Sequence, residues 1–185
     1  MPEPSTLLIL VRHGRTAWNA EGRFLGRTDL PLDEEGREQA RACAAQLPWT
    51  LDAVYSSSML RARQTARAFG EPVVVPGLQE LDQGDLDGLA AAEAIERWPA
   101  FFQAWSQDPT DLRPPGSTEC LRDLQQRALA ALGRIAADHR GQTVAVVSHQ
   151  LVLSSVLCAV HDDPLAKWRR HRLENLAVVP VRDHA

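Results

Sequence analysis

Two short apolar runs, Leu7–Val11 and Val144–Val147, constrain the fold of this chain more than any other feature. Uninterrupted runs of this length are typical of strands that are buried on both faces of a parallel sheet. Segments with helical spacing separate the predicted strands, which favours an α/β fold with a mostly parallel central sheet flanked by helices on both faces. We predict strands near residues 6–12, 52–56, 72–75, 143–148 and 176–181, and helices over 34–47, 60–69 and 119–139.

Length and composition set further limits. The chain has 185 residues, of which 44% are hydrophobic, so it can bury a core without disulfide bonds. No internal repeat is visible, and we expect residues 1–185 to form a single domain. Within it, the segment at about 76–116 is rich in proline and is expected to run over the active-site end of the sheet as an excursion.

The charge and the cysteines bear on partners and location. A formal net charge of −4 argues against nucleic acid or an acidic membrane as a partner, because both bind broad positive surfaces. The three cysteines lack the spacing of a zinc site or a disulfide framework. No segment has the pattern of a secretory signal or a membrane span. We therefore expect a cytoplasmic protein with reduced thiols, and predict no particular oligomeric state.

Each of the two apolar runs leads directly into a histidine. Arg12-His13-Gly14 follows the first run, and Ser148-His149 follows the second. Ligand sites of open α/β sheets lie outside the carboxyl ends of the strands, so we expect both imidazoles to face one crevice. Arg61 lies in the first turn of a predicted helix, where the helix dipole favours a bound anion. Together these residues predict an anion-binding pocket.

The segment Leu78–Gly88 carries four acidic residues among glycines, which suits a loop better than a helix. Such clusters can hold magnesium or calcium, so a metal site is one interpretation of this loop. The spacing lacks the EF-hand pattern, however, and the pocket already has arginines to supply positive charge. We expect that neither a metal nor a cofactor is required.

Longer blocks extend these motifs over nearly the whole chain. They are Arg12–Asn19, Gly26–Leu32 with Gly36 and Gln39-Ala40, Leu60–Ala66, Glu80 with Gly84 and Gly88, Trp98-Pro99, Asp108-Pro109, Pro115-Gly116, Glu119 and Val147–His149. In their order and spacing the chain resembles the histidine phosphatase superfamily. The resemblance is to the phosphoglycerate mutase-like branch, which also contains small phosphatases such as α-ribazole phosphatase and broad-specificity phosphatases.

The resemblance implies a role for each residue of the pocket. His13 would be the nucleophile that takes the phosphoryl group. Glu80 would protonate the leaving oxygen and then activate water, and Asp82, Asp85 and Asp87, which could compete for this role, are expected to form turns and contact solvent. The groups expected around the phosphoryl oxygens are Arg12, Arg61, His149 and, as a neutral donor, Asn19.

These roles have physical requirements of their own. Attack by a ring nitrogen needs a neutral imidazole whose other nitrogen donates a hydrogen bond, most simply to a backbone carbonyl. An alkoxide leaving group needs a proton. A carboxyl group held near a phosphate anion should have a raised pKa, because the two like charges repel, and it would then serve as an acid near neutral pH.

The implied activity is metal-independent hydrolysis of a small phosphorylated metabolite through a phosphohistidine. A mutase-type phosphoryl transferase and a non-catalytic phosphate-binding module are the alternatives. Mutases of the family carry Arg-His-Tyr-Gly just after the acidic residue, together with a longer insertion. Here Glu80 is followed by Leu81-Asp82-Gln83 and the insertion is short, which favours a phosphatase.

Three places depart from the family pattern or remain open. Gln150 stands where many relatives have glycine, and its side chain is expected to crowd or contact the substrate. Arg15 replaces an acidic residue and is expected to make the pocket mouth more positive, which would suit a substrate with a second anionic group. The aromatic segment Trp98–Trp105 either covers the crevice or forms a satellite core.

Overall fold

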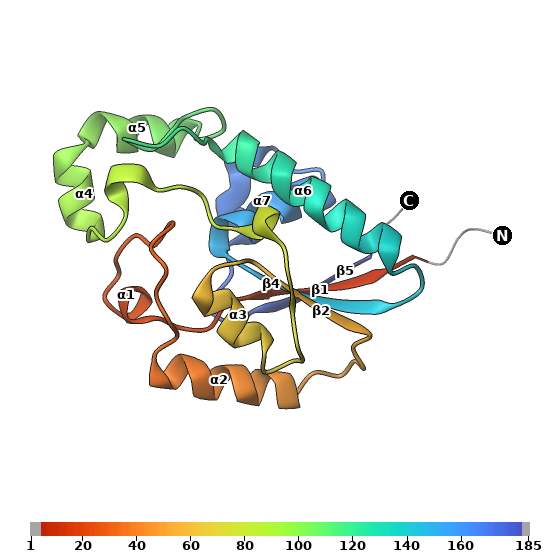
Figure 1. Cartoon of the computed structure of the whole chain (residues 1–185). Coiled ribbons are helices and arrows are strands. Elements are labelled where there is room, and N and C mark those ends of the chain that lie inside the picture. The colour runs from red at the N-terminus through yellow and green to blue at the C-terminus, as the bar shows by residue number, and fades with distance from the viewer. Residues whose placement is uncertain (1–4, 183–185) are drawn as a thin grey trace.

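The computed structural model describes residues 5–182, which form one five-stranded sheet with helices on both sides (Figure 1). The strands lie in the order β3-β2-β4-β1-β5. Neighbouring strands among β1 to β4 pair in parallel, whereas β5 pairs antiparallel with β1 at one edge. The predicted fold class is therefore confirmed. The strands are β1 Leu7–Arg12, β2 Ala53–Ser56, β3 Val73–Val74, β4 Thr143–Ser148 and β5 Val178–Arg182.

Each of the three predicted helices is present and is shorter than expected. In the first of them, the Asp33 side chain caps the helix by accepting a hydrogen bond from Gly36 N at 2.7 Å. No helix within residues 5–182 has both the length and the apolar character needed to cross a membrane. The α-helices are α1 Ala17–Ala20, α2 Glu34–Ala45, α3 Leu60–Ala66, α4 Ala91–Arg97, α5 Pro99–Gln107, α6 Leu121–Asp138 and α7 Gln150–Val160. The 3₁₀ segments are η1 Pro76–Leu78, η2 Gly84–Leu86 and η3 Leu165–His171.

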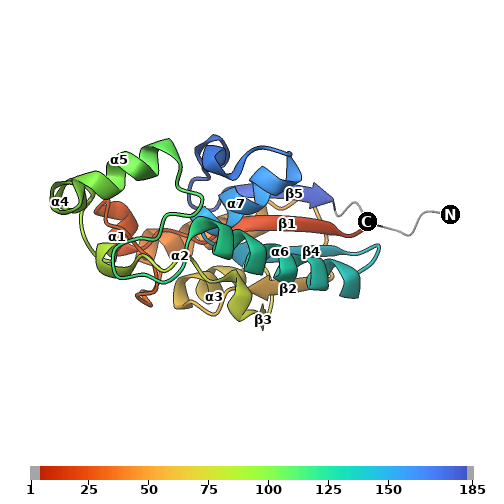
Figure 2. The same cartoon turned by 90° about the horizontal axis from the view of Figure 1, so that it is seen from above.

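The sheet is buried on both faces, as its apolar strands require. Helices α6 and α7 cover one face and α2 and α3 cover the other (Figures 1 and 2). Along β1, Leu8 and Leu10 pack into the cluster under α6 and α7, whereas Ile9 and Val11 pack into the cluster under α3. Because successive side chains of a strand point to opposite faces, an unbroken apolar run supplies both cores at once.

The segment 76–116 leaves the sheet and returns to it at α6. Its helices α4 and α5 lie beyond the carboxyl ends of the parallel strands (Figure 1). Backbone hydrogen bonds tie it to the loop that follows α1, from Phe24 N to Leu89 O and from Gly88 N to Phe24 O, both at 2.9 Å. These bonds join the loop after α1 to the segment 76–116, and together the two segments form one wall beside the end of the sheet.

Helix α2 packs backbone to backbone against the segment that follows β1. A Cβ atom built on Gly36 would lie 2.1 Å from Arg15 O, and one built on Gly14 would lie 2.8 Å from Gly36 O. Both distances are far below van der Waals contact. Glycine at these two positions therefore lets α2 support the turn that leaves β1.

We expect Gly36→Ala to lower the free energy of unfolding by about 1–3 kcal/mol, the usual cost of forcing a methyl group into a packed site. Gly133→Ala, in the exposed interior of α6, has no atom within 4 Å of the new Cβ and serves as the control. It should raise the free energy of unfolding by about 0.5–1 kcal/mol, because alanine favours helix. Urea denaturation measures both. A Gly36→Ala protein as stable as wild type would contradict the close packing of α2.

Candidate active site

The two strand-end histidines meet at one corner of the sheet. Strands β1 and β4 are neighbours, and their register sets Arg12 opposite Ser148, so the next residue of each strand leaves the sheet at the same level. These residues are His13 and His149, whose ring centroids lie 5.2 Å apart. Both side chains are buried. The structure therefore brings together the pair that the sequence predicted.

His13 has the hydrogen bonding that a nitrogen nucleophile needs. Its Nδ1 lies 2.7 Å from Gly14 O, and since a carbonyl can only accept, Nδ1 carries the proton and Nε2 carries the lone pair. Gly14 N donates in turn to Thr65 Oγ1 at 2.9 Å, which fixes this turn. Burial first, and then the charges of Arg61 and Arg12, hold the pKa of His13 well below its usual range. The imidazole is therefore neutral at physiological pH.

Two guanidinium groups flank the histidines. Arg12, the last residue of β1, donates from one terminal nitrogen to Leu173 O at 2.6 Å, and Arg61 donates to Thr28 O at 2.9 Å and Gly26 O at 2.8 Å. Within residues 5–182 the buried Nε atom of each has no hydrogen-bond partner. Burial lowers the pKa of Arg61 to about 10, so the group stays charged at neutral pH. An oxyanion held here would meet two desolvated cations.

Asp87 holds the loop that positions Arg61. Its carboxylate accepts hydrogen bonds from Gly26 N and Thr28 N, both at 2.8 Å, and the carbonyl groups of the same two residues bind Arg61. The expectation that Asp87 only forms a turn and contacts solvent is corrected, because Asp87 supports Arg61.

Among residues 5–182, no three His, Cys, Asp or Glu side chains are grouped as a metal site would require.

His149 is the N-cap residue of helix α7 and is held by the residue that follows the neighbouring strand β2. Its Nε2 lies 2.8 Å from Ser57 Oγ, which follows β2, while its buried Nδ1 has no partner within the described chain. Burial, followed by the charge of Arg61, holds the pKa of His149 well below its usual range. The residue sits at the amino end of α7, where the helix dipole favours an anion.

Glu80 reaches the same corner from the segment between η1 and η2. Its carboxyl oxygens accept hydrogen bonds from Leu81 N at 2.9 Å and Leu151 N at 3.2 Å, and only 4% of the residue is exposed. Burial raises its pKa above the usual range, although both hydrogen bonds and the two arginines oppose this shift. The raised pKa agrees in direction with the expectation from sequence. Its main cause in the protein is burial, which removes water from the carboxyl group.

Asn19 lies beside His13 and is held by a residue that the sequence did not single out. Its Oδ1 accepts hydrogen bonds from Thr16 N at 3.1 Å and Asn175 Nδ2 at 3.4 Å, which leaves its own amide hydrogens available as donors. Asn175 Nδ2 also donates to His13 O at 2.8 Å. No motif marks Asn175, because it lies in an irregular stretch before β5 and its role follows only from the fold.

A cleft of about 420 Å³ opens from this corner. Arg12, His13 and Glu80 lie at its floor, and Phe101, Phe102 and Trp105 line one wall. Trp105 also belongs to the main hydrophobic core, and Phe101 packs against that core. The aromatic segment therefore lines the cleft and packs on the core with the same side chains, Phe101 and Trp105, and the core it joins is the main one rather than a satellite.

Gln150 lines this cleft, but neighbouring groups hold its amide. Nε2 donates to Ser154 Oγ at 2.9 Å, and Oε1 accepts from Leu173 N at 3.3 Å. The side chain therefore links α7 to the segment that follows η3. Contact with the substrate remains a prediction for this residue.

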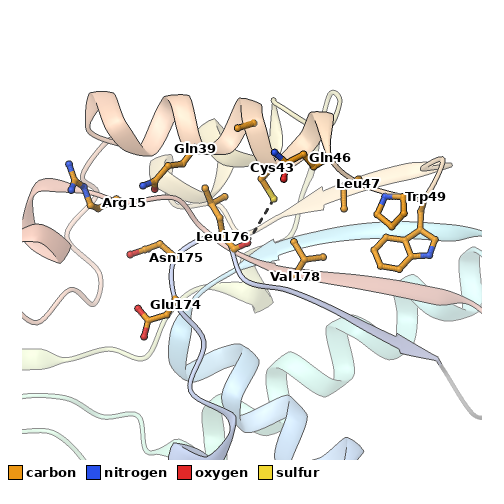
Figure 3. Close-up of a pocket in the computed structure, with 12 residues that line it drawn as sticks. Arg15, Gln39, Cys43, Gln46, Leu47, Trp49, Glu174, Asn175, Leu176 and Val178 are labelled. Atoms are coloured by element: carbon orange, nitrogen blue, oxygen red, sulfur yellow. Dashed lines mark hydrogen bonds between the residues drawn. The ribbon is translucent and has the colours of Figure 1, made fainter.

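Arg15 does not reach the cleft, and the expectation that it makes the pocket mouth more positive is corrected. Its guanidinium group pairs with Asp33 at 2.8 Å and Glu35 at 2.6 Å, because the first turn of α2 presents two carboxylates to it. It lines a separate hollow of about 670 Å³ between α2 and the segment 174–178 (Figure 3). Asn175 also lines this hollow, which therefore backs onto the wall that supports His13.

Comparison with known proteins places this geometry in a family. The sequence model of the histidine phosphatase superfamily (branch 1) matches residues 8–184. The chain belongs to this superfamily. The family predicted from the motifs is therefore confirmed, and the buried corner of two histidines and two arginines lies within the matched residues of this histidine phosphatase.

Named relatives agree with this assignment. The histidine phosphatase is 39% identical over 159 residues to a metal-independent phosphoserine phosphatase of Arabidopsis thaliana, covering 82% of this chain and 67% of the relative. It is 33% identical over 167 residues to phosphoserine phosphatase 1 of Hydrogenobacter thermophilus, covering 87% and 79%. The solved structure of a mycobacterial glucosyl-3-phosphoglycerate phosphatase superposes with a TM-score of 0.87 at 28% identity, covering 97% and 91%. The predicted enzyme class, a phosphatase, is confirmed.

The position of Asn175 generates a prediction. Asn175→Ala removes the hydrogen bonds to His13 O and Asn19 Oδ1, and we expect kcat/KM for an aryl phosphate to fall about 2- to 10-fold, the range for one or two neutral hydrogen bonds. Gln46→Ala is the matched control, since Gln46 lines the same hollow. Steady-state kinetics measure kcat/KM for both variants. Equal values for Asn175→Ala and Gln46→Ala would contradict a supporting role for Asn175.

Proposed function

We propose that this protein hydrolyses phosphomonoesters through a phosphohistidine formed on His13, with Glu80 as general acid and then general base. The observation that carries the proposal is the convergence of a neutral His13, with its lone pair on Nε2, on one corner with two desolvated arginines. Fixed positive charge around the equatorial oxygens and in-line positioning of the nucleophile are what phosphoryl transfer requires.

The first step forms a P–N bond and breaks the ester P–O bond. His13 Nε2 attacks phosphorus, and the ester oxygen leaves as the alcohol after taking a proton from Glu80. Arg12, Arg61 and His149 bind the three phosphoryl oxygens, whose negative charge is greatest in the transition state. The bond from His13 Nδ1 to Gly14 O holds the ring and stabilises the positive charge that develops on it.

The second step restores the enzyme. Glu80, now ionised, takes a proton from water as the water oxygen attacks phosphorus. The P–N bond breaks, inorganic phosphate leaves, and both His13 and Glu80 return to their starting protonation states. The two arginines supply stabilising charge throughout and His149 supplies a hydrogen bond, so the proposed reaction uses no metal and no cofactor.

The proposed substrate is a small phosphorylated metabolite. The cleft of about 420 Å³ falls in the range of small-molecule sites. Relatives named as phosphoserine phosphatases and a glucosyl-3-phosphoglycerate phosphatase support a substrate of this size.

We expect the protein to release inorganic phosphate from p-nitrophenyl phosphate at the same rate with and without excess EDTA. His13→Ala should abolish this release, because it removes the ring nitrogen that takes the phosphoryl group in the proposed first step. Acid-labile, base-stable phosphate should be trapped on His13 by rapid quench, and peptide mass spectrometry locates it. Turnover that is lost in EDTA, or retained in His13→Ala, would overturn the mechanism.

Two other outcomes would identify the alternative functions. Isomerisation of phosphoglycerate without phosphate release would indicate a mutase. Binding of phosphate without turnover would indicate a phosphate-recognition module.

The assignment of Glu80 generates a separate prediction. Glu80→Gln keeps the shape of the side chain and removes the proton donor, so kcat/KM for alkyl phosphates should fall about 10²- to 10⁴-fold. The loss should be much smaller for p-nitrophenyl phosphate, whose leaving group needs little protonation. An equal loss on both substrates would mean that Glu80 acts by structure alone.

The same variant tests the pH dependence. The first step needs the protonated form of Glu80, and burial raises the pKa of this group, so kcat/KM for alkyl phosphates should stay high through the acid range and fall as pH rises through the raised pKa. The Glu80→Gln protein should lack this alkaline limb. His13 should add no limb near its ordinary pKa, because its pKa is held well below that value.

A further inference from the structure

The cleft has a second wall, formed by η3 and the residue after it. Trp168, Arg169 and Arg172 all line the cleft that contains His13. The segment is firmly attached to α7, since Ser154 Oγ donates to the carbonyl group of His171 at 2.8 Å. These three side chains therefore line the cleft from a backbone that α7 holds in place.

Arg169 and Arg172 have no counter-ion. Within the described chain neither guanidinium group forms a hydrogen bond or an ion pair, and Arg169 only stacks over the Trp168 ring at 4.7 Å. Arg23, which also lines the cleft, differs because it pairs with Glu21 at 2.6 Å and donates to Gly88 O at 2.9 Å. Among the described residues that line the cleft, Arg169 and Arg172 therefore carry two neighbouring positive charges without an ion-pair partner.

These charges lie next to the phosphoryl-binding corner. The guanidinium group of Arg12 donates to the carbonyl group of Leu173, the residue directly after Arg172. Burial lowers the pKa of Arg12, the charges of Glu80 and Glu174 oppose this shift, and the charge of Arg172 adds to it. Burial followed by the charge of Arg172 lowers the pKa of Arg169. Mutual repulsion of this kind is relieved when an anion binds between the cations.

Trp168 supplies an independent sign that this wall is built for a polar ligand. Only 9% of the residue is exposed, and its indole Nε1 has no hydrogen-bond partner within residues 5–182. Buried donors are rarely left without an acceptor. The other buried donors without partners are mostly those of the phosphoryl corner, namely the Nε atoms of Arg12 and Arg61 and the Nδ1 atom of His149.

We propose that Arg169 and Arg172 form a second anion-binding subsite, which selects phosphomonoesters that carry a carboxylate or another negative group a few bonds from the phosphate. The inference rests on the proposed function and names its substrate class. The phosphoryl group is bound at the floor by Arg12, the remote anion is bound at the wall by Arg169 and Arg172, and the aromatic side chains of α5 contact the carbon skeleton between them.

Pairs of esters that differ in one carboxylate test this subsite. The pairs are 3-phosphoglycerate with glycerol 3-phosphate, phosphoserine with phosphoethanolamine, and 4-carboxyphenyl phosphate with phenyl phosphate. We expect wild type to prefer the acidic member of at least one pair in kcat/KM. In Arg169→Gln and Arg172→Gln this preference should fall about tenfold each, the order for one exposed charge-assisted hydrogen bond. Arg172→Lys should retain part of it.

Lys167→Gln is the matched control, because Lys167 lies on the same 3₁₀ segment and outside the cleft lining. Its preference for the acidic member should equal that of wild type. The subsite is overturned if wild type shows no preference for the acidic member of any pair. It is also overturned if both arginine variants keep the wild-type preference, or if they lose kcat/KM equally on both members of every pair.

Failure of the proposed function gives a different result. Turnover of the carboxylate-free esters by wild type tests hydrolysis, whereas the ratio within a pair tests the subsite. If wild type turns over none of the six esters, hydrolysis is rejected. The affinities of the acidic and the carboxylate-free member of each pair are then measured by calorimetry. A tenfold fall of the ratio of these affinities in the arginine variants would still support the subsite.

Discussion

The parallel pairing of β1 with β4 is the constraint on which the active site depends. Both strands are apolar on both faces, so side-chain alternation alone would tolerate a shifted register. Backbone hydrogen bonds continue the ladder past the strand ends, with His13 N donating to Ser148 O at 2.9 Å and Ser57 N donating to Val147 O at 3.0 Å. The backbone of the proposed nucleophile is thus part of the sheet. A shift of one residue would separate His13 from His149 and dismantle the corner.

Electrostatic strain is the cost of this arrangement. Two guanidinium groups and two imidazoles share a buried corner, and Arg61 is bound by backbone carbonyl groups instead of a carboxylate. Burying charge without a full partner is unfavourable, and the same lack of water keeps His13 neutral and raises the pKa of Glu80. Both shifts favour the forms that the proposed mechanism needs, a neutral His13 and a protonated Glu80, and a bound phosphate dianion would supply negative charge to the two arginines.

The sequence predicted the parts of the site that strand ends and helix ends determine. The positions of His13, His149 and Arg61 follow from the rule that parallel strands end at one edge of the sheet. Helix α7 was not predicted, because a helix buried on all sides shows an apolar run without helical periodicity. Arg15 was misplaced, since the two carboxylates that hold it come from the capping turn of α2, and no one-dimensional pattern shows that contact. Asn175 was missed because irregular backbone carries it to His13.

The site divides into a corner that the sheet builds and walls that other segments add. The ends of β1, β4 and α3 and the segment between η1 and η2 supply the proposed reacting and charge-stabilising groups, whereas α5 and η3 line the rest of the cleft. The two parts meet at Arg12, whose guanidinium group lies in the corner and donates to Leu173 O at the end of the η3 wall. Under the proposed mechanism, a group bound at that wall would be connected through this hydrogen bond to an arginine that binds the phosphoryl group. Binding energy from the remote part of a substrate would then help to orient Arg12 for the transition state, and substitutions in the wall would change kcat as well as KM.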